Sequence, residues 1–189
     1  MTLYLGMFTL TGKTRAAFLC FFLSHVPITI LIDGQAFLPK SWYPRQLQEV
    51  LQWYAATFRD SLMMKATQDE GGASDVWFTS LVGIELILQL PFFVYSVYVL
   101  TSTNREESRW TRGDGVFRSL CMIYGSVTCT TLVPIFASIH ADPATTAMEK
   151  AVLGGFYFPY FVFPFWLVLI AASSENVFGR TRSKDFKVG

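Results

Sequence analysis

The sequence predicts an all-α, polytopic membrane protein: a four-transmembrane-helix bundle with a short extra helix in the first loop. Hydrophobic residues make up 52% of the 189-residue chain and charged residues only 15%, against roughly 25% charged residues in an average soluble domain. Four separate apolar stretches are each long enough to cross a bilayer, which takes roughly 17–25 residues. The formal net charge of +1 provides no basic surface, so nucleic acid is not an expected partner.

The four predicted spans cover about residues 16–32, 76–100, 116–139 and 152–172. We therefore expect a single membrane domain over residues 1–189 that ends in a tail at 173–189. The first span is short, which suits a thin bilayer such as that of the endoplasmic reticulum. The third span is the least uniform, because it contains Arg118 and several Thr and Ser residues.

The distribution of Lys and Arg predicts the orientation in the membrane. Four spans place both termini on one side, and that side carries ten Lys and Arg residues against five on the other. Cytosolic loops carry an excess of these residues. We therefore expect both termini in the cytosol and the long first loop in the lumen.

The first loop contains a helical pattern. In "YPRQLQEVLQWYAATFRDSLM" the apolar residues that share one helix face are Leu47, Val50, Leu51, Tyr54 and Phe58. Pro44 stands where a helix can begin. This segment is expected to form an amphipathic helix that lies over the bundle as a cap.

The cysteines predict no disulfide framework and no metal site. The chain has three of them, Cys20, Cys121 and Cys129, and contains no C-x-x-C motif. We expect them to be small buried apolar residues. No cofactor is expected either.

Prolines and polar residues within the spans predict a cavity. Each span contains at least one proline, and prolines bend helices and can leave space between them. Counting helical rise from the loop side places His25, Glu85 and Thr131 about 12–13 Å deep, with Gln89 one turn beyond Glu85. Tyr157 and Tyr160 enter the fourth span within its first ~6–12 Å. All four spans thus bring polar groups to the half of the membrane nearest the first loop.

Two carboxylates stand out among these groups. A charged residue at the centre of a membrane helix costs about 2.5–3.5 kcal/mol, so Glu85 is expected to face the interior. It serves there either in a hydrogen-bonded clamp with Gln89 and His25 or in a ligand pocket. Asp33 lies at the mouth of the first span, where a carboxylate walled by aromatic side chains suits a protonated amine.

The same residues carry a family resemblance, which covers most of the chain in order. The segments are "FLSHVPITILIDGQAFLP" (22–39), "LQWYAATFRDSLM" (51–63), "IELILQLPFF" (84–93), "TTLVPI" (130–135) and "YFPYFVFPF" (157–165). Together they closely resemble the sigma-2 receptor (transmembrane protein 97) family, which belongs to the EXPERA-domain group with the emopamil-binding sterol isomerases.

The resemblance implies a four-helix protein of the endoplasmic reticulum, often a homodimer, that binds sterols and lipophilic amines within the membrane. It assigns the ligand-binding acid to Asp33, a second pocket acid to Asp60, and a structural glutamate to Glu85 with Gln89 as its partner. The other pocket positions that it matches are His25, Thr131, Tyr157 and Tyr160. It also implies a role in cholesterol homeostasis, with membrane lipids and a Niemann–Pick-type cholesterol transporter as partners.

Two functions remain open at this point. The first is a sterol or amine receptor, in which none of these residues is catalytic. The second is an isomerase or cyclase that acts on a sterol or terpenoid-like substrate through a carbocation. Such an enzyme needs an acid, a base and a negative or π-rich wall, which Asp33, Asp60, Glu85 and His25 would provide. The resemblance favours the receptor.

Overall fold

The computed structural model describes residues 9–68, 76–102, 112–173 and 177–178, and the regular secondary structure of these residues is helical. Four helical segments are long and apolar enough to cross a membrane: Gly12–Ala36, Val76–Ser102, Gly115–Ala141 and Ala147–Ser173. Each contains one of the predicted spans. The prediction of an all-α, four-span membrane protein is therefore confirmed. The predicted tail beyond Ser173 lies almost wholly outside the described residues.

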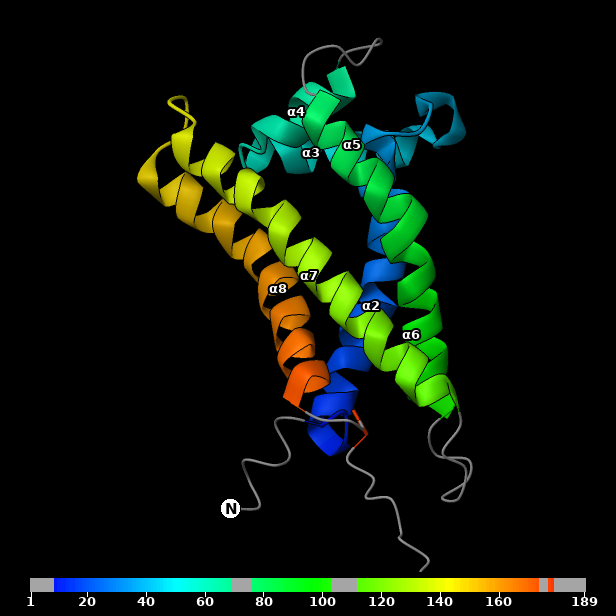
Figure 1. Cartoon of the computed structure of the whole chain (residues 1–189). Helices are drawn as coiled ribbons and strands as arrows, with labels where there is room; N and C mark the ends of the chain where they lie inside the picture. Colours follow the sequence, from blue (N-terminus) through cyan, green and yellow to red (C-terminus); the bar gives the residue numbers. More distant parts are fainter. Residues whose placement is uncertain (1–8, 69–75, 103–111, 174–176, 179–189) are drawn as a thin grey trace, which may run out of the picture.

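The spans pack as two pairs (Figure 1). Helix α2 (Gly12–Leu31) packs along α6 (Leu90–Ser102), and α7 (Arg112–Ala141) packs along α8 (Ala147–Ser173). Helices α3 (Arg45–Thr57) and α4 (Ser61–Gln68) lie across one end of the bundle, here called the loop end. The start of α2 and the end of α8 share the opposite end, here called the terminal end, where the Leu10 N–H donates to the Val177 carbonyl at 2.6 Å.

The amphipathic helix predicted in the first loop is α3. Pro44 directly precedes it, and its inner face buries Leu51 and Ala55. Two short 3₁₀ turns, η1 (Asp33–Ala36) and η2 (Lys40–Trp42), connect α2 to α3. The Tyr43 hydroxyl donates to the Ile30 carbonyl at 3.0 Å, so the loop is tied to the end of α2. Helix α4 was not predicted.

The second span is not a regular α-helix throughout. Helix α5 (Val76–Ile84) continues into a π-helical turn, η3 (Glu85–Gln89), before α6 begins at Leu90. Pro91 explains the local change, because proline has no N–H to donate to the carbonyl four residues earlier. The Leu90 N–H bonds the Glu85 carbonyl instead. Such single π turns inside α-helices occur frequently at functional sites.

The fourth span begins five residues earlier than the predicted start at Val152. Thr146 and Glu149 form a capping box: the Thr146 N–H donates to Glu149 Oε2 at 2.8 Å, and the Glu149 N–H donates to Thr146 Oγ1 at 3.3 Å. This arrangement satisfies backbone donors that a helix start leaves unpaired. Tyr157 and Tyr160 consequently lie about 15 and 20 Å from the start of α8, deeper than expected.

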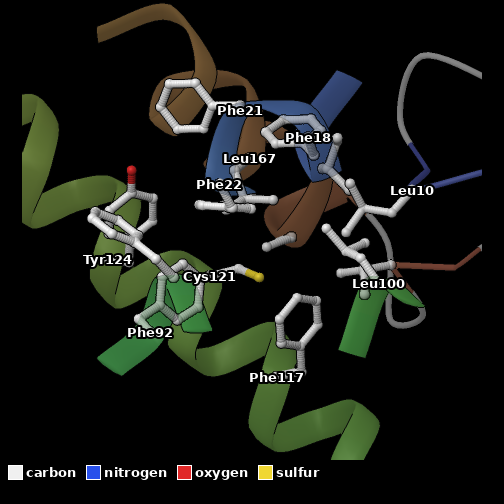
Figure 2. Packing of buried hydrophobic residues seen from close by; sticks show 14 of the residues in the cluster. Leu10, Phe18, Phe21, Phe22, Phe92, Leu100, Phe117, Cys121, Tyr124 and Leu167 are labelled. Carbon is white, nitrogen blue, oxygen red and sulfur yellow. The ribbon is translucent and has the colours of Figure 1, made fainter. Parts of the chain in front are cut away.

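The terminal half of the bundle is filled by aromatic side chains (Figure 2). The rings of Phe92 and Tyr124 stack with centroids 4.6 Å apart, and those of Phe21 and Phe163 with centroids 4.5 Å apart. Cys121 is buried in this cluster, as predicted, whereas Cys20 is exposed. The expectation that all three cysteines are buried is therefore wrong for Cys20, which lies on an exposed face of α2, and Cys129 is only half-buried.

Large apolar side chains cover the outside of the spans. Leu23, Ile87, Ile123 and Val133 are each about 60% exposed. Exposed apolar surface on this scale is rare in soluble monomers. Lipid is the environment that suits it.

Candidate functional site

Two cavities lie at the loop end of the bundle. The inner cavity has a volume of about 100 Å³ and lies among α2, η1, α4, α5, η3, α7 and α8. The outer cavity has a volume of about 320 Å³ and lies among α2, α3, α4 and α8. Four residues line both cavities: Asp33, Met63, Tyr157 and Tyr160.

Glu85 lines the inner cavity and is held by two residues of α2. The Thr29 hydroxyl donates to Glu85 Oε1 at 2.7 Å, and His25 Nε2 lies 3.3 Å from the same oxygen. Thr29 is fully buried and His25 is 6% exposed. Within the described residues, His25 Nδ1 is buried without a hydrogen-bond partner. The π-helical turn thus places Glu85 against α2.

Gln89 also lines the inner cavity, but its partner lies on α7. The Thr128 hydroxyl donates to Gln89 Oε1 at 3.0 Å. Thr131 lines the cavity one turn along α7, and its hydroxyl donates to the Thr128 carbonyl at 3.0 Å. Glu85 and Gln89 therefore link η3 to two different helices rather than to each other.

Asp60 is 1% exposed and lies at the loop end, directly before α4. Its Oδ1 accepts the Met63 N–H at 3.0 Å, so Asp60 caps the N-terminus of α4. Its Oδ2 accepts the Tyr157 hydroxyl at 2.9 Å and the Tyr54 hydroxyl at 3.5 Å. Burial raises the pKa of the Asp60 carboxyl above its ordinary value, although these hydrogen bonds act in the opposite direction. Asp60 is not among the residues that line either cavity.

Asp33 has a different environment. It begins the η1 turn and faces both cavities. No described residue donates a hydrogen bond to its carboxylate, whereas Glu85 and Asp60 each accept hydrogen bonds. Neither cavity is lined by a Lys or Arg residue of the described chain. The site is therefore suited electrostatically to a cation.

The structure brings seven of the eight predicted site residues to the cavities. These are His25, Asp33, Glu85, Gln89, Thr131, Tyr157 and Tyr160. Sequence reasoning missed Thr29, Tyr54, Met63 and Thr128. Thr29 was detectable as the residue one helical turn after His25, whereas Thr128 becomes significant only through its contact with Gln89.

Comparisons with known proteins place the chain in a family. A family model described as EBP, EXPERA (EXPanded EBP superfamily), matches residues 46–171. Human Sigma intracellular receptor 2 is 32% identical over 165 residues, which span 82% of this chain and 84% of that protein. Its Xenopus tropicalis counterpart is 32% identical over 160 residues, which span 80% and 84% of the two chains.

A yeast protein extends the similarity beyond vertebrates. Efficient mitochondria targeting-associated protein 19 of Saccharomyces cerevisiae is 28% identical over 168 residues, or 84% of this chain and 97% of that protein. The matched region includes the loop-end helices and the three spans that follow them. The chain therefore belongs to the EXPERA (expanded EBP) superfamily, in the family of Sigma intracellular receptor 2.

Proposed function

We propose that this protein is a receptor-like membrane protein that binds lipophilic cationic amines and sterols in the two loop-end cavities. The observation that carries the proposal is Asp33, a carboxylate that faces both cavities and accepts no hydrogen bond from a described residue. An unpaired carboxylate in an apolar surrounding is costly. A protonated amine removes that cost by supplying the missing positive charge and N–H donors.

The surroundings of Asp33 support the same ligand class. Tyr157 and Tyr160 place aromatic rings beside it, and aromatic faces attract cations by about 0.5–2 kcal/mol. Trp53 and Tyr54 continue the aromatic wall of the outer cavity. A ligand with one charged nitrogen and a large apolar body matches this combination.

Sterol binding and a role in sterol homeostasis form the part of the proposal that relies on family membership. The relatives named Sigma intracellular receptor 2 support a receptor-like role. An outer cavity of about 320 Å³ with apolar walls offers room for part of a fused-ring body. The homodimer and the Niemann–Pick-type transporter stay predictions.

We further propose the endoplasmic reticulum as the location, with both termini in the cytosol. The excess of Lys and Arg on the terminal side supports this orientation. Arg15 and Arg118 lie at the terminal end, where their guanidinium groups donate to the Leu100 and Ala171 carbonyls. Protease protection of tags at each terminus and in the first loop, in sealed microsomes, tests the orientation.

Replacing Asp33 tests the proposed function directly. Asp33→Asn should weaken binding of a lipophilic tertiary amine by about 30-fold or more, because an interaction between charges of about 2 kcal/mol or more is lost. Binding of an uncharged sterol should change little, since the Asn oxygen still accepts a hydrogen bond. Glu49→Gln removes an exposed acid from α3 and serves as the control. Unchanged amine affinity in a folded Asp33→Asn protein would refute the assignment.

One observation favours a second candidate, a sterol isomerase or cyclase. Glu85 and His25 form a close acid–base pair beside the inner cavity, and proton transfer requires such a pair within hydrogen-bond reach of the substrate. Purified protein incubated with candidate sterols and followed by NMR and mass spectrometry distinguishes the two functions. A double-bond shift that disappears in Glu85→Gln would establish the enzyme, whereas the receptor should release every sterol unchanged.

A further inference from the structure

The two cavities share one stretch of their lining, here called the partition. Asp33, Met63, Tyr157 and Tyr160 line both of them, whereas the remaining lining residues differ. The inner cavity continues over polar residues of η3 and α7, including Glu85, Gln89 and Thr128. The outer cavity continues over apolar and aromatic residues such as Ile28, Val50 and Trp53.

The members of the partition differ in how firmly they are held. The Tyr157 hydroxyl is fixed to Asp60 Oδ2 at 2.9 Å. The Tyr160 ring packs edge-on against the His25 ring, with centroids 4.6 Å apart. Met63 is anchored through its backbone N–H, but its side chain is unbranched and has three rotatable bonds. Shortening the Met63 side chain leaves the Tyr157 bond to Asp60 and the ring contact of Tyr160 with His25 in place.

The chambers also differ in size. An engineered protein cavity of about 150 Å³ is large enough for benzene. The inner cavity, at about 100 Å³, is smaller than this engineered cavity. The outer cavity, at about 320 Å³, is roughly twice the size of the engineered cavity. A cation bound to Asp33 at the partition has its substituents directed into chambers of unequal volume.

We propose that Met63 is a specificity-determining residue that limits the inner substituent of a bound amine. The ligand class that fits is a secondary or tertiary amine with one compact arm, smaller than a phenyl ring, and one bulky apolar arm. The compact arm occupies the inner cavity and the bulky arm occupies the outer one. This inference rests on the proposed function, since it requires that Asp33 binds the charged nitrogen.

The test compares two amines that differ only in the compact arm. The probes are the N-methyl and N-benzyl derivatives of diphenylpropylamine, titrated against the purified full-length protein in nanodiscs. The wild type should bind the N-methyl probe at least tenfold more tightly, because even one methylene group of mismatch in an apolar pocket changes binding by about 10–200-fold. Met63→Ala joins the two chambers and should bring the ratio of the two affinities close to one.

Matched variants keep the test decisive. Met64→Ala truncates the neighbouring methionine, which lines neither cavity, and should keep the wild-type ratio. Met63→Val removes less of the side chain and should shift the ratio in the same direction by a smaller factor, which covers the case in which Met63→Ala does not fold.

A wild-type ratio near one, or an unchanged ratio in the folded Met63 variants, would overturn the assignment of Met63 alone, provided that N-methyl binding still depends on Asp33. Absence of binding of both probes to the wild type would overturn the proposed function together with it.

Discussion

The Thr29 hydroxyl donates a 2.7 Å hydrogen bond to Oε1 of Glu85 and so joins α2 to the π-helical turn of the second span. Both residues lie in membrane-spanning segments, where a polar group exposed to lipid without a partner would cost several kcal/mol. The bond therefore fixes how the first two spans sit against each other at the inner cavity.

Thr29→Val should lower the stability of the protein without abolishing amine binding. Valine preserves the shape of the side chain but removes the donor to Glu85, and a typical intramolecular hydrogen bond contributes about 0.5–1.5 kcal/mol. Thermal unfolding of the purified protein measures the effect. Thr29→Ser retains the hydroxyl, so its melting temperature should fall less than that of Thr29→Val. Equal melting temperatures for wild type and Thr29→Val would show that the bond does not hold the helices together.

Glu85→Gln should likewise reduce thermal stability more than it changes ligand selectivity. The glutamine still accepts from Thr29, but an amide replaces the carboxyl group whose Oε1 lies 3.3 Å from His25 Nε2. Melting temperature and the relative affinities of several amines are measured on the same preparations. A normal melting temperature combined with altered selectivity would instead make Glu85 a ligand-contacting residue.

Asp60→Ala should destabilise the loop end. The change removes the cap of α4, which costs about 1 kcal/mol, and leaves the buried Tyr157 hydroxyl without its acceptor, which costs a further ~1–3 kcal/mol. Amine affinity should fall as well, because Tyr157 would no longer be held in place. A variant with unchanged melting temperature would contradict the supporting role of Asp60.

The pH dependence of stability provides an independent test at the same residue. Burial raises the pKa of Asp60, so the folded protein retains this proton to a higher pH than the unfolded chain. Its contribution to stability is therefore largest below the usual Asp value of 3.8 and falls as pH rises through the raised pKa. Asp60→Asn should lack this fall when melting temperatures are compared from about pH 3 to about pH 7.

Asp142 is a control residue whose contribution to stability should depend on pH in the opposite direction. Its carboxylate accepts the Ala144 N–H, which lowers its pKa, so its contribution is present above the usual Asp value and disappears on acidification. Asp142→Asn should lower the melting temperature more near neutral pH than in acid. If both variants showed the same pH profile, burial would not be what sets the behaviour of Asp60.

Gly125→Ala should force α7 and α8 apart. A Cβ atom at this position would lie 2.6 Å from the Pro164 carbonyl oxygen and 2.5 Å from Val168 Cγ2, and overpacking of this kind costs about 1–3 kcal/mol. Gly115→Ala on the same helix meets nothing within 4 Å and is the matched control. Its melting temperature should stay the same or rise, because alanine favours the helix.

Arg118→Met should weaken the terminal end of the bundle. Arg118 Nε donates to the Ala171 carbonyl at 2.6 Å, near the C-terminus of α8, where carbonyls lack helical partners. A loss of about 1–2 kcal/mol is expected from unfolding measurements. Arg45→Met removes an exposed ion pair with Glu49 and should cause no measurable change.

The course of the second span shows where sequence reasoning stops. Its length and apolarity are visible in the sequence, and so is Pro91. The π turn that Pro91 accompanies rotates Glu85 toward α2 and leaves Gln89 facing Thr128 on α7. A regular helix model places both residues on one face and suggests that they act together. The π-helical backbone instead directs Glu85 and Gln89 to two different helices.

The sequence by itself determined the number of spans, the amphipathic helix of the first loop and the polar groups that the spans bring to the cavities. These properties follow from hydropathy, length and periodicity, which are local. Only the tertiary structure decided that Asp60 reaches Tyr157 across 97 residues, and that Asp33 and Met63 both line the two cavities. Such pairings depend on how each helix is rotated and tilted against its neighbours, and that arrangement is set by packing over the whole bundle.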